Sequence, residues 1–148
     1  HRDLHSFPTR RSSDLELGIG LVPFAPLGRG FLAGDVKRAE DLPADDFRKN
    51  DPRYMGANFD ANLAAARTVR EVAAGLGATP AQVALSWLLH KGGDIVPIPG
   101  TKRRKYLEEN LAAACITLDA THMATLDAAL GEVRGERYSP GHMAMVDR

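Results

Sequence analysis

Apolar residues occur in two patterns along this chain, as short continuous runs and at helical spacing. Residues 17–24 and 95–98 are short, nearly continuous apolar runs, which are typical of strands buried in a parallel sheet. Residues 59–76 instead carry apolar side chains at intervals of three and four, as on one buried face of a helix. The spacing therefore predicts both buried strands and amphipathic helices.

Local signals predict three further helices. A capping box with proline at the first helical position predicts a helix from Thr79 to the glycine pair at residues 92–93. Residues 103–114 predict another helix after the second apolar run, and Asp119 is a suitable N-cap for a last one over residues 119–130.

Two segments show no sustained period. Residues 35–58 are polar and are interrupted by two prolines and a glycine, which predicts a long surface loop of the kind that forms lids or binding loops. Residues 131–148 are rich in glycine and polar side chains and predict an extended C-terminal arm.

The order of these elements indicates the fold class. Strand, Gly-rich turn, long loop, two helices, strand, turn and two helices predict an α/β fold with a parallel sheet, in which ligands bind at the carboxyl ends of the strands. Two strands cannot bury both faces of a sheet, so we expect these elements to be part of a larger one.

The first fifteen residues, HRDLHSFPTRRSSDL, differ from the rest. They match the translation of a common sequencing-library adapter, and we interpret residues 1–15 as an assembly artefact outside the fold. We expect the biological sequence to begin near Glu16.

Composition narrows the function classes. The 148 residues are 44% hydrophobic and 26% charged, as in an ordinary globular protein, and the net charge of zero argues against nucleic-acid binding. No apolar run approaches about 20 residues and no secretory signal is visible, so we predict no membrane span and a cytoplasmic location. The single cysteine, Cys115, lies among apolar residues and is predicted to be a buried, inert thiol. The histidines are scattered, so no metal site is predicted.

The two predicted turns carry the candidate chemistry. Residues 25–30 contain two glycines, a proline and Arg29, so their backbone can approach a ligand closely. In the second turn Gly100 and Thr101 precede four consecutive cations, residues 102–105, at the start of a helix. Because a helix N-terminus is itself positive, cations are unfavourable there unless an anion is bound. The pattern therefore predicts a phosphate site.

A purely structural interpretation of the cations stays open. Arg104 with Glu108, and Lys105 with Glu109, are spaced as ion pairs on a solvated helix start. That interpretation does not account for the other two cations of the turn.

Several motifs resemble the C-terminal part of the aldo/keto reductases. They are FAPLGRGFL at residues 24–32, TPAQVALSW at residues 79–87 and VPIPGTKR at residues 96–103, followed by Glu-Asn at residues 109–110. The resemblance runs from about residue 16 to 138 and implies a (β/α)8 TIM barrel that binds NADPH in extended form. This chain would supply about strands 7 and 8, their helices and a C-terminal helix, with residues 139–148 as a tail.

The resemblance also implies cofactor-binding residues. The nicotinamide and pyrophosphate would lie along Phe24, Ala25, Pro26, Leu27, Gly28 and Arg29, with the Phe24 ring stacked on the nicotinamide. The adenosine end would be held by Gly100, Thr101, Lys102, Arg103, Glu109 and Asn110, the first four at the 2′-phosphate. Ala25 stands where Ser is common, and Tyr106 where many members carry Gln or Arg.

In this family an aldehyde or ketone is reduced by hydride transfer from NADPH, with a Tyr as general acid beside Lys, Asp and His. Those residues belong to earlier barrel units, so we predict no catalytic residue in this chain, and an inactive fragment of a reductase of small carbonyl substrates. Tyr54 and Tyr138 fall elsewhere and are interpreted as structural or exposed. The alternative hypothesis is a non-catalytic, nucleotide-binding regulatory subunit of the same fold. The sequence predicts no oligomeric state.

Overall fold

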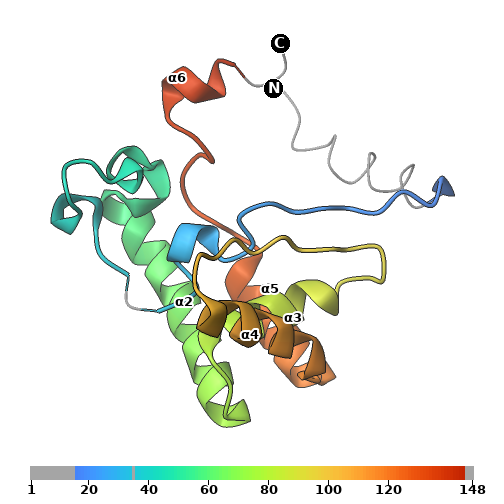
Figure 1. Ribbon diagram of the computed structural model, residues 1–148. Coiled ribbons are helices and arrows are strands. Elements are labelled where there is room, and N and C mark those ends of the chain that lie inside the picture. Colours follow the sequence, from blue (N-terminus) through green and yellow to red (C-terminus); the bar gives the residue numbers. More distant parts are fainter. Residues whose placement is uncertain (1–15, 35, 146–148) are drawn as a thin grey trace.

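The computed structural model describes residues 16–34 and 36–145, and helices make up most of this part of the chain (Figure 1). The α-helices are α2 (Gly56–Leu76), α3 (Pro80–Leu89), α4 (Arg104–Ala112), α5 (Ala120–Leu130) and the short α6 (Pro140–Met143). The 3-10 helices are η1 (Gly28–Gly30), η2 (Ala39–Asp41), η3 (Phe47–Asn50), η4 (Pro52–Tyr54) and η5 (Ala113–Cys115). The prediction for residues 1–15 lies outside the described residues.

Helix α2 packs against η4, α3 and α5, whereas α4 packs against α3. The buried positions of α2 recur every three or four residues and are Phe59, Asn62, Ala66, Val69 and Ala73. This spacing confirms the predicted helix, which begins slightly earlier, at Gly56. The first half of α2 packs against residues that precede it, and the second half packs against α3 and α5. Gly77 ends the helix in the left-handed conformation, with φ of 62°.

The predicted caps of α3 and α5 are confirmed. The Thr79 hydroxyl accepts a hydrogen bond from the Gln82 backbone N–H, and the Gln82 side chain accepts one from the Thr79 N–H. The Asp119 carboxylate likewise caps α5 by accepting from the His122 N–H. In the described residues no single helix has the length and apolar character to cross a membrane, and the α2–α3 pair that passes together is bent by 95°.

The two predicted strands are much reduced. They form only two isolated parallel bridges, Leu21 with Ile95 and Phe24 with Ile98, so the parallel direction is right but regular strands are absent from the described residues. The extended segments lie side by side (Figure 1). Pro23 lacks the N–H that a parallel ladder would direct at the Val96 carbonyl, which is a physical reason for its interruption. Pro97 does not interrupt it, because the N–H groups that donate to the first segment are those of Val96 and Ile98.

The apolar side chains of these segments are also less buried than predicted. Ile95 is buried, but several neighbours are about half exposed or more: Leu17, Ile19, Val22, Phe24, Val96 and Ile98. In the described part of the chain each segment bridges only to the other, so one face of the pair has no covering layer.

Residues 36–55, here called the excursion, fall in the predicted long surface loop but are partly helical and partly buried. They contain η2, η3 and η4, and they bury Ala39, Leu42 and Tyr54 in one cluster with Phe31 and Phe59. The Phe31 ring meets Tyr54 edge-on, with 5.2 Å between ring centroids. The excursion is therefore a packed part of the fold.

The prediction of a buried thiol at Cys115 is wrong. Cys115 ends η5 and is exposed, whereas Ala113 in the same turn is buried at 1% exposure. A single 3-10 turn can direct only part of an apolar run inward, and here Ala113 takes the inward position.

The C-terminal arm is anchored to α2. Asn62 is 7% exposed; its Oδ1 accepts from the Arg134 N–H at 2.8 Å, and its Nδ2 donates to the Arg134 carbonyl at 2.8 Å. Gly135 follows with φ of 91°, and an added Cβ would lie 3.0 Å from the Pro52 carbonyl oxygen. The predicted extended arm is therefore held closely here, and it also contains α6.

Candidate functional site

Both predicted turns meet at one cavity. A cavity of about 340 Å³ lies between the Gly-rich turn, the second turn and the neighbouring faces of α3 and α4. Among the predicted site residues, it is lined by Ala25, Pro26, Leu27, Arg29, Gly100, Thr101, Glu109 and Asn110. The fold therefore brings together segments that are far apart in the sequence.

The other predicted residues lie around this cavity. Phe24 and Gly28 line an adjoining cavity of about 330 Å³, to which Ala25 and Arg29 also contribute. Lys102 and Arg103 are exposed and line neither of these two cavities.

The start of α4 keeps the charge pattern seen in the sequence. Arg103 is the N-cap residue, and its N–H donates to the Thr101 hydroxyl at 3.2 Å. The first turn of α4 contains no acidic residue. The helix end therefore presents a positive dipole together with basic side chains, an arrangement that favours an anion.

The structural interpretation of the cations holds only in part. Arg104 pairs with Glu108 at 3.7 Å, and both side chains are largely exposed, so the pair contributes little. Glu109 is instead bound by α3, because the Thr79 hydroxyl donates to its Oε1 at 2.7 Å and the Gln82 amide donates to its backbone carbonyl at 3.2 Å. Sequence reasoning found the capping box and missed this second role, although a hydroxyl that accepts from a backbone N–H still has a hydrogen to donate.

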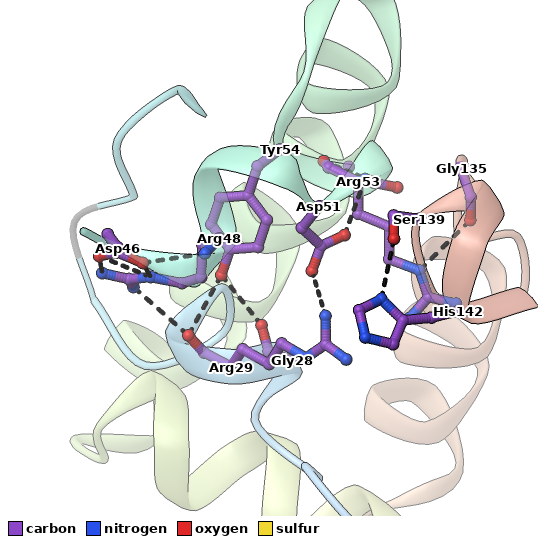
Figure 2. Close-up of polar contacts among 11 residues, drawn as sticks. Gly28, Arg29, Asp46, Arg48, Asp51, Arg53, Tyr54, Gly135, Ser139 and His142 are labelled. Carbon is purple, nitrogen blue, oxygen red and sulfur yellow. Dashed lines mark hydrogen bonds and ion pairs between the residues drawn. The ribbon is translucent and has the colours of Figure 1, made fainter. Parts of the chain in front are cut away.

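The Gly-rich turn is bound by the excursion (Figure 2). The Tyr54 hydroxyl donates to the carbonyl oxygens of Gly28, at 3.1 Å, and Arg29, at 3.2 Å. Arg48 donates to the same Arg29 carbonyl at 3.4 Å, and the Arg29 guanidinium pairs with Asp51 at 2.6 Å. These excursion residues were missed by sequence reasoning, because no local motif connects them with the turn.

The protonation states suit these contacts. Burial raises the pKa of Tyr54, so its hydroxyl keeps the proton that it donates. Hydrogen bonds from Arg48, first from its side chain and then from its backbone, lower the pKa of Asp46 to about 2. The same pairing raises the pKa of Arg48, so both groups stay charged near neutral pH.

In the described residues no group of three or more His, Cys, Asp or Glu side chains is placed to hold a metal ion. The site consists of glycine turns, a helix N-terminus, hydroxyls, cations and the exposed rings of Phe24 and Tyr106.

Comparison with known proteins places this chain in a family. The model of the "Aldo/keto reductase family" matches residues 12–130, a range that starts inside the N-terminal segment discussed above. The chain therefore belongs to the aldo/keto reductase family.

Curated relatives include the aldo-keto reductase yakc [NADP(+)] of Schizosaccharomyces pombe, 48% identical over 128 residues, which are 85% of this chain and 38% of the relative. The aldo-keto reductase str7 of Strobilurus tenacellus is 37% identical over 134 residues, covering 89% of this chain and 40% of the relative. The chain thus spans about two fifths of the length of these relatives.

Solved structures also resemble this chain in fold. A thermostable aldo-keto reductase in complex with the inhibitor epalrestat has a TM-score of 0.54 and 30% identity, covering 80% of this chain and 32% of that one. The glycerol dehydrogenase of Gluconobacter oxydans has a TM-score of 0.71, covering 86% of this chain and 38% of that one; its 23% identity shows likeness of fold alone.

Proposed function

We propose that this chain is the C-terminal cofactor-binding part of a cytoplasmic, NADPH-dependent reductase of aldehydes or ketones. The observation that carries the proposal is the cavity at which the Gly-rich turn, the second turn and α4 meet. The relative that is 48% identical is itself named for NADP(+), which supports the choice of cofactor.

The residues present fit an extended dinucleotide. Phe24 offers a half-exposed ring for the nicotinamide, and the Gly-rich turn offers backbone that a pyrophosphate can approach. Glu109 and Asn110 line the cavity where the adenine would lie. When bound, NADPH supplies the hydride; the residues of this chain bind and orient it.

The second turn would select the 2′-phosphate. Lys102 and Arg103 provide two charges beside the Thr101 hydroxyl and the α4 N-terminus. The Arg103 guanidinium lies 6.0 Å from the Tyr106 ring centroid, so this aromatic departure from the family pattern offers a support for the cation. These groups favour NADPH over NADH, because only NADPH carries the phosphate.

The barrel is part of the proposal. The exposed apolar face of the two extended segments is what the remaining strands of a (β/α)8 barrel would cover, and the curated relatives are more than twice as long as the matched part. Residues 16–138 would form the last barrel units, residues 139–148 the tail, and the Tyr, Lys, Asp and His of catalysis would lie on earlier units.

The test uses the complete reductase that carries this sequence. NADPH and NADH are titrated against wild type, Lys102→Ala and Arg103→Ala by fluorescence quenching. A charge-assisted hydrogen bond contributes about 1.5–3 kcal/mol, and about 1.4 kcal/mol is tenfold in Kd. We expect the Kd of NADPH to rise about tenfold for these exposed side chains, with little change for NADH.

Arg104→Ala is the matched control. It removes one charge from the same helix start, at a position outside the four residues that we propose for the 2′-phosphate. Equal effects of all three variants, or an unchanged NADPH preference, contradict the proposed role of Lys102 and Arg103. Reduction of a simple aldehyde by the complete protein separates a reductase from a nucleotide-binding subunit.

A further inference from the structure

The side chain of Arg29 is enclosed by the protein. It is 23% exposed and pairs with Asp51 at 2.6 Å. Its guanidinium carbon lies 5.6 Å from the Phe47 ring centroid and 5.5 Å from that of Tyr138, one from the excursion and one from the C-terminal arm. Three segments therefore meet on one cation of the Gly-rich turn.

Asp51 holds two parts of this arrangement at once. Its side chain is 3% exposed; Oδ2 binds the Arg29 guanidinium, and Oδ1 accepts from the Arg53 N–H at 3.0 Å and so caps η4 (Figure 2). A buried carboxylate is stable only when paired and hydrogen-bonded, so Asp51 depends on Arg29 as much as Arg29 depends on Asp51.

The backbone of the turn needs such support. Arg29 has φ of 58° and ψ of 32°, the left-handed conformation that is unfavourable for a residue with a Cβ. Tyr54 donates to the carbonyl oxygens of Gly28 and Arg29, which belong to the two peptide groups that flank Arg29, and Arg48 donates to the second of them. Side chain and backbone of Arg29 are thus both fixed from the excursion.

We propose that Asp51 and Tyr54 are positioning residues that hold the Gly28–Gly30 turn in its cofactor-binding conformation, with Arg29 as their anchor. This inference rests on the proposed function. It changes the role expected of Arg29, because the guanidinium is used by Asp51 and the turn meets the pyrophosphate with its backbone. The excursion then acts as a fixed support of the site.

Asp51→Asn in the complete reductase isolates the ion pair. The amide oxygen can still cap η4, while the amide nitrogen replaces the oxygen that faces Arg29. We expect the Kd values of NADPH and NADH to rise by the same factor, about tenfold, with kcat at saturating cofactor close to wild type. Their ratio stays constant, because the 2′-phosphate residues are untouched.

Three further variants sharpen the result. Asp51→Glu keeps the charge and recovers most of the affinity; equal losses in D51N and D51E contradict a role of the charge. Asp60→Asn is the matched control, because the Asp60 carboxylate is exposed and its ion pair is with Arg38 instead of with the turn, and we expect it to leave Kd unchanged. The double variant Arg29→Ala with D51N should have the same Kd as the single variant that binds NADPH more weakly, because both changes remove one ion pair. If the two increases in binding free energy add in the double variant, the proposal is overturned.

Hydrogen exchange of the backbone amides of residues 28–32 tests the anchoring without a cofactor. We expect faster exchange in Asp51→Asn and Tyr54→Phe than in wild type and Asp60→Asn. Unchanged exchange overturns the anchoring, and faster exchange with unchanged Kd overturns its role in binding. If wild type binds neither cofactor, the proposed function fails, while faster exchange still supports an anchored turn.

Discussion

Asn62 is the residue at which a single side-chain change tests the packing around the site most sharply. From the buried face of α2 its amide makes two hydrogen bonds to the backbone of Arg134 and a third to the Arg53 carbonyl, at 3.2 Å. It therefore joins α2, η4 and the C-terminal arm.

The cost of Asn62→Ala follows from these contacts. Each hydrogen bond contributes about 1 kcal/mol net, which gives an upper value of about 3 kcal/mol. Arg134 is exposed, so water can satisfy its freed backbone groups, and we expect a loss of about 2 kcal/mol in the free energy of unfolding. Asn62→Asp has the same shape but places carboxylate oxygen against two carbonyl oxygens, so we expect a larger loss, about 3–5 kcal/mol at about pH 8.

The pH dependence separates the two variants. A buried carboxylate facing carbonyl oxygens has a folded-state pKa above its unfolded value, so the penalty of Asn62→Asp is full at high pH and shrinks as pH falls through that raised pKa. The deficit of Asn62→Ala stays nearly constant over the same range, because alanine does not titrate.

Urea unfolding of the complete protein at about pH 8 and about pH 5, followed by circular dichroism, measures both effects. Glu71→Ala, which changes an exposed side chain of the same helix, is the control. Trypsin should also cleave the arm faster at Arg134 and Arg137 in the Asn62 variants. If the free energy of unfolding of Asn62→Ala lies within about 0.5 kcal/mol of that of Glu71→Ala, the Asn62 hydrogen bonds do not anchor the arm.

Three further outcomes are expected. Thr79→Ala removes the α3 cap and the hydrogen bond to Glu109, so it should lower the free energy of unfolding by about 1–2 kcal/mol and also weaken NADPH binding. Thr79→Ser keeps the hydroxyl and should keep both the stability and the affinity. Equal stability and affinity of the two variants contradict the capping geometry. Cys115 is exposed, so iodoacetamide should alkylate it in the native protein, as peptide mass spectrometry can show; protection until unfolding contradicts this. The pKa of Asp46 is lowered from 3.8 to about 2, so its pair with Arg48 stabilises the fold above about pH 4, and this stabilisation is lost as pH falls toward 2. The free energy of unfolding of Asp46→Asn should therefore change less than that of wild type between about pH 4 and pH 2. Identical acid profiles of variant and wild type refute the stabilisation by this pair.

Helices were predictable where their signals are local. The cap of α3 at Thr79, the cap of α5 at Asp119 and the spacing of buried residues in α2 each depend on side chains within a few residues of one another. Such signals are complete in the sequence, because the same short segment contains both donor and acceptor. Only the exact helix ends differed from the prediction.

The excursion was not predictable for the opposite reason. Its helices are single turns, too short to show a hydrophobic period, and Tyr54 is buried by residues before and after it in the sequence. Of the site, the two turns were visible from glycine content and charge, and the cofactor assignments come from the family resemblance. Asp51 and Tyr54 lie more than twenty residues from the turn that they bind, and no sequence pattern predicts contacts between segments so far apart.

The two extended segments keep the side-chain alternation of strands, although they form no regular sheet in the described residues. Val22 and Phe24 are two residues apart and both exposed, as are Val96 and Ile98, while Ile95, next to Val96, is buried. This is the alternation of a strand with one covered and one open face, although the segments form only isolated bridges. In the barrel that we propose, the open face would meet the other strands, and Phe24 would remain at the end of its strand with its ring toward the cofactor. The period of two thus predicts the orientation of these side chains, whereas their burial depends on strands elsewhere in the proposed barrel.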